Sequence, residues 1–398
     1  MSMVSRSIAS RVASQFTRVG DIGSVYGGVQ VKGDISVSEA IKLAGLDWRV
    51  KKLPVQVVSE MEAKPGEVFE AQVALRDKYH TIIPGFTGLY RKDIGENGEK
   101  INFPLGIIPD KQRSRLLKGF SATCRSDTGE PLGIVKTRYE PLQNHDAFSW
   151  IDNLVGKDGA CVSSAGALFG GRMTWLCVDL GGFDVVPGDE VRKHLLVFNS
   201  HDGSTNLLAI MLPHRIACQN MLNFYLGKGT DTYKIRHTDG AKVKMADIDK
   251  VLAIAYSSFS KAQNAFKMMQ QTRIEGDNTR NLIYDCLLGD DADKSLQDLA
   301  EDKFNKTPTW VKQAEVIEHI METGPGANFG KNTVWGVFNG VNGYFDHVKA
   351  FRGANGIEDK HIEANPHISI ESKLFGQAAR MKMRAFEQCD LYTQKARS

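Results

Sequence analysis

Between residues 195 and 238 the chain places polar and ionisable side chains in a context that otherwise has the composition of a hydrophobic core. His and Asp side chains can ligate a metal ion in a nuclease or phosphohydrolase, whereas Arg and Asn side chains bind phosphate groups and bases. Turn formation and helix capping are the structural alternative for the same residue types. The residues concerned are His201, Asp202, Arg215, Asn220, Arg236 and His237.

A metal centre is one chemistry that these residues could support. Its ligands would be His201, Asp202, His237, Asp346 and His347, which must converge in space before they can ligate one ion. The alternative for His201-Asp202-Gly203 is a turn in which Asp202 binds its own backbone and His201 is free to contact a ligand. We expect no metal and no cofactor, and a metal-dependent enzyme stays open as the alternative.

Cysteine chemistry has less support in this sequence. The six cysteines are scattered, with no Cys-x-x-Cys pair and no Cys/His spacing of a zinc module, so we expect reduced cysteines in a cytoplasmic protein. Cys218 is a possible nucleophile if it lies at the start of a helix, where the helix dipole lowers a thiol pKa. Burial of Cys218 in a core is the alternative.

Nucleic-acid binding has broader support, because cations alternate with aromatic residues along predicted hairpins. Cations can bind the phosphates of a single strand while Tyr139 and Trp175 stack on its bases. The alternative for Trp175 is a place in the core. The residues predicted to bind nucleic acid are Arg125, Lys136, Arg138, Tyr139, Arg172, Trp175, His201, Arg215, Asn220, Arg236 and His237.

Composition and missing motifs narrow the class of protein. The chain has 398 residues and a net charge of +3, which suits a globular protein of two or three domains and leaves a local basic groove possible. No apolar run approaches the roughly 20 residues that span a bilayer, so we expect a cytoplasmic protein that does not enter membranes. No phosphate-binding loop, dinucleotide fingerprint or nucleophile elbow is present, which argues against ATP hydrolysis and hydride transfer.

The elements that must position these residues form an α+β fold. A basic N-terminal arm covers residues 1–30, and a sheet domain follows over residues 31–238. Its expected elements are a helix at 37–46, strands at 48–58 and 69–75, a long loop or flap at 84–109, a hairpin at 119–138 and a helix from 144. Strands at 160–167, 171–180, 195–198 and 207–212, and then a helix at 215–226, complete an antiparallel hairpin sheet backed by helices on one face.

A mostly helical region covers residues 239–398. Apolar residues at three- and four-residue spacing predict one long amphipathic helix over 248–269. Further helices are expected at 279–288, 309–321, 332–350 and 374–389.

Several ordered motifs resemble a phage- and plasmid-associated protein family of unknown function, DUF932. They are Ala44-Gly45-Leu46-Asp47-Trp48, Leu132-Gly133-Ile134-Val135, Ser200-His201-Asp202-Gly203, Arg215-Ile216-Ala217-Cys218-Gln219-Asn220, Arg236-His237-Thr238 and Asn332-Thr333-Val334-Trp335-Gly336. The resemblance also includes Tyr344, Asp346 and His347, and it implies no catalytic residues. It implies a context of mobile elements that often handle DNA, and the architecture is analogous to single-strand annealing proteins of the Rad52 and Red-beta type.

We therefore expect a phage-type single-stranded DNA-binding protein that anneals strands in recombination or replication without ATP. A homo-oligomer in the cytoplasm of a phage- or plasmid-bearing host would align grooves from successive subunits, so that modest charge per chain sums along the strand. A metal-dependent nuclease or phosphohydrolase is one alternative. A non-enzymatic phage interaction protein, such as a virion component or an inhibitor of host defence, is the other.

Overall fold

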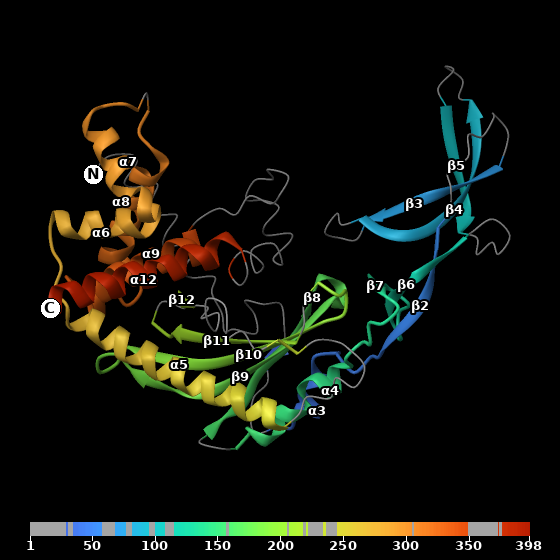
Figure 1. Ribbon diagram of the computed structural model, residues 1–398, viewed down its shortest axis with the longest axis horizontal. Helices are drawn as coiled ribbons and strands as arrows, with labels where there is room; N and C mark the ends of the chain where they lie inside the picture. Colours follow the sequence, from blue (N-terminus) through green and yellow to red (C-terminus); the bar gives the residue numbers. More distant parts are fainter. Residues whose placement is uncertain are drawn as a thin grey trace.

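The computed structural model describes residues 29–30, 35–57, 68–76, 82–94, 100–107, 115–156, 159–204, 207–217, 220–221, 234–235, 245–304, 306–348, 373 and 376–398. Strands dominate the first half of the described chain and helices dominate the second (Figure 1). The strands form three separate sheets in which every pair is antiparallel. The predicted α+β class, with a mostly helical C-terminal region, is confirmed.

The main sheet contains the predicted hairpin of residues 195–212. Its strands β10 and β11 pair from Val191 opposite Arg215 to Phe198 opposite Leu208. The turn between them begins at His201, where the apolar runs end. In spatial order the sheet is β1 (Val29–Gln30), β8 (Cys161–Leu168), β9 (Met173–Asp184), β10 (Glu190–Ser200), β11 (Leu207–Arg215) and β12 (Asn220–Met221), with β13 (Lys234–Ile235) also paired to β11.

Helices cover one face of this sheet. Side chains of α3 (Val37–Leu43), α4 (Asn144–Phe148), the 3₁₀ segment η1 (Ser149–Asn153) and α5 (Met245–Gln271) share a hydrophobic cluster with Leu176, Leu195 and Val197. Helix α3 begins where the sequence predicts, because Ser36 and Glu39 form a capping box. The opposite face of the sheet is also apolar and buried, with Trp175, Leu196 and Phe198 in a second cluster.

Two smaller sheets precede the main one along the chain. One consists of β2 (Val50–Val57), β6 (Arg115–Arg125) and β7 (Pro131–Lys136), and the other of β3 (Val68–Arg76), β4 (Ile82–Ile94) and β5 (Lys100–Ile107). The prediction that residues 84–109 form a long loop is therefore wrong. Pro84 and Pro104 suggest a loop, but each lies at a shift in strand register, where a bulge accommodates proline.

The prediction of a helix at 215–226 is also wrong for the residues of that range that the structure describes. Arg215 is the last residue of β11, and β12 pairs back on it, with Asn220 opposite Arg215 and Met221 opposite His214. The apolar spacing that suggested a helix belongs to a chain that reverses between Arg215 and Asn220 and pairs with its own preceding strand. Residues 222–226 lie outside the described residues.

The predicted C-terminal helices are confirmed. They pack around an aromatic cluster in which Phe266 lies 4.8 Å from Trp335 and 5.6 Å from Phe338 between ring centroids. The helices after α5 are α6 (Asp277–Leu288), α7 (Ala292–Ala300), α8 (Thr309–Thr323), α9 (Val334–Gly343) and α12 (Gln377–Arg397), with short segments η4 (Gly289–Asp291), η5 (Ala327–Gly330) and the π-helix η6 (Tyr344–Val348). No helix within the described ranges is long and apolar enough to cross a bilayer.

Candidate nucleic-acid interface

The outer face of the sheet β2–β6–β7 exposes apolar side chains beside cations. Leu53, Phe120 and Ile134 are 47%, 41% and 38% exposed. Phe120 lies directly opposite Lys136 in the strand register, and Lys51 lies two residues before Leu53, so both side chains share one side of the sheet. We call Lys51, Leu53, Phe120, Ile134 and Lys136 the outer sheet face.

The charge of this sheet has one sign. Its three strands carry Lys51, Lys52, Arg115, Lys118, Arg125 and Lys136 and no acidic residue. Two of these cations are neutralised locally, because Arg125 binds Asp127 through two hydrogen bonds and Lys52 contacts Glu140. Lys51, Lys136 and the exposed Arg138 form no ion pair with any described residue. Their charges are available to an anionic ligand.

The inner face of the same sheet packs on the turn that follows β10. The Thr123 hydroxyl donates to the His201 carbonyl oxygen over 2.7 Å, and the Tyr139 hydroxyl donates to the Ser200 carbonyl oxygen over 2.9 Å. Burial, with a smaller contribution from the Asp202 carboxylate, raises the pKa of the Tyr139 phenol. Gly133 lies against Asp202 with no room for a side chain. The turn of residues 201–204 therefore fixes the position of the exposed sheet.

His201 and Asp202 are parts of this junction. His201 is fully buried, and its Nε2 lies 2.8 Å from Asn144 Oδ1, which also accepts a hydrogen bond from Thr174. The imidazole meets the Trp48 ring edge-on, with 5.3 Å between centroids. Asp202 Oδ1 accepts hydrogen bonds from the Ser200 hydroxyl and the Ser204 amide. The predicted turn role of Asp202 is confirmed, whereas His201 is enclosed and does not face solvent.

The other residues predicted to bind nucleic acid are distributed between surface and core. Lys136 and Arg138 are exposed, Arg125 and Tyr139 are half-buried, and the half-buried Arg172 lies over the Phe169 ring. Trp175, Arg215 and Asn220 are buried, so they lie in the interior and not on a groove surface. Trp175 lies in the core because side chains along β9 alternate between the two faces of the sheet, and Trp175 points to the face that carries the second hydrophobic cluster. Arg236 and His237 lie outside the described residues.

The described residues of the alternative metal centre do not come together. Among described residues no three His, Cys, Asp or Glu side chains come together at one point. His201 contacts Asn144, whereas Asp346 is bound to Lys382 between η6 and α12. His347 is buried beside Asp346, and His237 and the candidate nucleophile Cys218 lie outside the described part of the chain.

The close approach of Gly133 to Asp202 gives a test of this junction. A Cβ atom at residue 133 would lie 2.6 Å from Asp202 Cα, so Gly133→Ala must displace backbone. We expect a loss of about 1–3 kcal/mol in the free energy of unfolding, the usual cost of overpacking. Urea denaturation measures it, and Ile134→Ala on the outer sheet face is the control, with a loss below about 1 kcal/mol. Equal losses for the two variants would contradict the packing described.

Comparison with known proteins identifies the family. The model of a family described as a domain of unknown function, DUF932, matches residues 131–368, more than half of the chain. The chain belongs to this family. No curated protein and no solved structure matches this DUF932 chain.

The family match covers only part of the outer sheet face of this DUF932 protein. Ile134 and Lys136 on β7 lie inside residues 131–368, whereas Lys51, Leu53 and Phe120 precede them. Those three residues are not among the residues that the sequence predicts to bind nucleic acid. The absence of acidic residues from three neighbouring strands is a signal that could have found them, but only once β2 and β6 are known to pair. Within the strand expected at 48–58, Lys52 contacts Glu140, whereas Arg49 and Lys51 are exposed.

Proposed function

We propose that this protein binds single-stranded DNA on the outer sheet face and promotes the annealing of complementary strands. The observation behind the proposal is the exposed Phe120 ring directly opposite Lys136, on a sheet whose strands lack acidic residues. An aromatic ring on a cationic sheet binds single strands well, because an unpaired base stacks on the ring while ammonium groups contact the phosphates.

The apolar neighbours of Phe120 favour a single strand over a duplex. Leu53 and Ile134 remain exposed beside the ring, and a duplex keeps the faces of its bases inside the stack, where such side chains cannot reach them. Contacts to phosphates and base faces carry no sequence information, so we propose binding without base-specific readout. Few cations per chain give weak binding, and an oligomer that aligns several outer sheet faces would strengthen it. We propose that the protein acts in hosts that carry phages or plasmids.

Fluorescence anisotropy with a labelled single strand of roughly 20 nucleotides tests the proposal, since one binding module covers about 4–16 nucleotides. We expect Phe120→Ala to weaken binding by roughly 5- to 100-fold, the effect of losing one base-stacking contact. The double variant Lys136→Ala, Arg138→Ala should lower the salt slope of log K by about 0.7 per lost phosphate contact.

Lys312→Ala is the matched control, because Lys312 is exposed on α8 and lies away from the outer sheet face. It should bind as the wild type does. Absence of binding at about 50 mM salt, where electrostatic contacts are strong, would overturn the proposal, as would equal affinities for the control and the Phe120 variant. Fluorescence quenching on pairing of complementary strands, without ATP, tests annealing separately from binding.

A further inference from the structure

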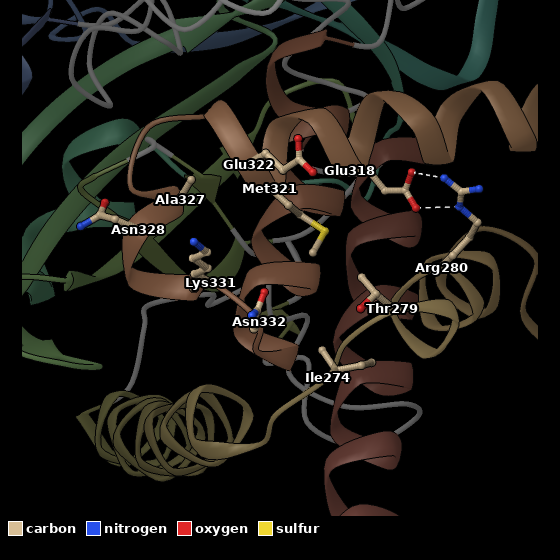
Figure 2. Close-up of a pocket in the computed structure, with 12 residues that line it drawn as sticks. Ile274, Thr279, Arg280, Glu318, Met321, Glu322, Ala327, Asn328, Lys331 and Asn332 are labelled. Atoms are coloured by element: carbon tan, nitrogen blue, oxygen red, sulfur yellow. Dashed lines mark hydrogen bonds and ion pairs between the residues drawn. The ribbon is translucent and has the colours of Figure 1, made fainter.

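A polar cavity lies among the helices of the C-terminal half, between the start of α6, the end of α8 and the segment η5 (Figure 2). Its volume is about 760 Å³, which is within the range of small-molecule sites. Figure 2 shows the lining side chains around one open space, with the Arg280–Glu318 pair at one end and Asn328 at the other. In Figure 1 these helices lie at the opposite end of the molecule from β2, β6 and β7. The cavity is therefore separate from the outer sheet face.

The charges in the lining leave one cation and one anion without a partner. Arg280 and Glu318 neutralise each other, with Nε 2.7 Å from Oε1 and Nη2 2.5 Å from Oε2. Lys331 and Glu322 also line the cavity, and neither forms an ion pair with another residue of the described chain. Met321 and Ile274 supply apolar surface in the same lining. Such a lining suits a ligand with an anionic group, hydrogen-bond donors and an apolar body.

A narrow recess continues the cavity into the interior. The two share Met321, Ala327 and Gly330, and Asn220 lines the recess. Asn220 is only 4% exposed, and its Nδ2 donates to the Asn339 carbonyl oxygen over 3.0 Å. Its Oδ1 receives no hydrogen bond from any residue that the structure describes. The recess has a volume of about 20 Å³, enough for one water-sized group.

A buried acceptor without a donor is costly, so the recess favours a ligand that brings an N–H or O–H group to Asn220. The small recess admits an amino group but not an aromatic ring. A planar base can remain in the larger cavity against Met321 while its exocyclic amino group enters the recess.

We propose that this cavity binds a nucleoside monophosphate whose base carries an exocyclic amino group. Lys331 pairs with the phosphate, Glu322 accepts hydrogen bonds from the sugar hydroxyls, and Asn220 Oδ1 accepts a hydrogen bond from the amino group. The site is independent of the proposed binding of single-stranded DNA. The chain would then sense or use free nucleotides at one end and bind nucleic acid at the other.

Calorimetry and saturation-transfer NMR with CMP, UMP, cytidine and inorganic phosphate test this proposal on the full chain. CMP should bind about tenfold more tightly than UMP, because UMP has a carbonyl where CMP has the donating amino group. Cytidine lacks the phosphate and should also bind at least about tenfold more weakly. Lys331→Ala should reduce CMP affinity to roughly that of cytidine, since it removes the phosphate partner.

Two variants test whether a loss of CMP affinity comes from the cavity lining or from a general change in the protein. Glu322→Ala should weaken CMP and UMP equally, because both contain the same sugar. Lys312→Ala, on α8 but outside the cavity lining, should leave CMP affinity unchanged. Equal affinity for CMP and UMP would overturn the proposal, and so would unchanged CMP binding by the Lys331 variant. Binding of inorganic phosphate as tight as that of CMP would also overturn it, because the base would then contribute nothing.

Discussion

Replacing Arg215 with Ala is expected to lower the free energy of unfolding by about 3–5 kcal/mol, the usual result of removing one partner of a buried ion pair. The Arg215 and Asp189 side chains are 4% and 0% exposed. Arg215 Nε donates to Asp189 Oδ1 over 2.6 Å, and its Nη2 donates to Oδ2 over 2.9 Å. Without the guanidinium, the carboxylate stays buried, and among the described residues it keeps only the Trp335 indole as a side-chain donor, at 2.8 Å.

The effect should extend from the main sheet to the helices. Asp189 immediately precedes β10, Arg215 ends β11, and Trp335 lies in α9, so one carboxylate links the two halves of the chain. Arg215 Nη2 also donates to the carbonyl oxygen of Gly326, the residue before η5. Urea denaturation of the full chain gives the loss of stability, and the cavity between α6 and α8 should bind CMP less tightly in the variant.

Arg280→Ala is the matched control for this prediction. Arg280 also binds a carboxylate through two hydrogen bonds, but its side chain is 52% exposed. Solvent screens such a pair, so the expected loss is only about 0–1 kcal/mol. Adding Asp189→Asn to the Arg215 variant should restore part of the stability, because the uncompensated charge is removed. Similar small losses for Arg215→Ala and Arg280→Ala would show that the buried pair has no special weight.

The sequence predicts those parts of the fold that depend on local pattern. The spacing of Phe259, Ala262 and Phe266 predicts α5, and the two apolar runs that flank the turn at His201 predict β10 and β11. Asn220 shows the limit of this reasoning, because its strand exists only through pairing with Arg215 across a reversal of the chain. The same applies to β4, in which Pro84 is accommodated by a bulge that no local signal indicates.

The candidate site follows the same division. Lys136 and Arg138 could be selected from the sequence because Lys136 ends a recognisable strand and Arg138 follows it, and both are exposed in the structure. Phe120 becomes important only through its position opposite Lys136, which is a property of the paired strands. The guanidinium of Arg215 suits phosphate binding, yet the Asp189 carboxylate pairs with it inside the protein. A sequence identifies the cations, but the tertiary partners decide which of them remain available to a ligand.

The second large effect is expected at Lys382, whose ammonium lies 2.7 Å from Asp346 Oδ1 with both side chains almost completely buried. Burial alone would raise the pKa of the Asp346 carboxyl, but Lys382, with His347 and Lys373, holds it below the ordinary value of 3.8. Lys382→Met should lower the free energy of unfolding by about 3–5 kcal/mol at neutral pH, because it leaves that carboxylate buried without its main partner.

The pH dependence gives this prediction a second readout. Because folding lowers the pKa of Asp346 in the wild type, the ion pair stabilises the folded chain above pH 3.8 and that contribution is lost as the pH falls through the folded-state pKa. In Lys382→Met, only His347 and Lys373 still oppose the effect of burial, so the pKa of Asp346 rises relative to the wild type and the carboxyl becomes neutral at a higher pH, where its penalty disappears. The stability difference between the two proteins should therefore narrow as the pH falls from neutral toward 4.

Two further variants separate the ion pair from simple loss of packing. Adding Asp346→Leu to Lys382→Met removes the buried carboxylate as well and should restore much of the stability, since apolar replacements of buried pairs are often neutral. Lys303→Met removes an exposed lysine that pairs with Asp298 and Glu301, and it should change stability very little at any pH. A stability difference for Lys382→Met that stays constant between neutral pH and pH 4 would show that Asp346 does not respond to Lys382, and that packing of the lysine side chain explains the loss.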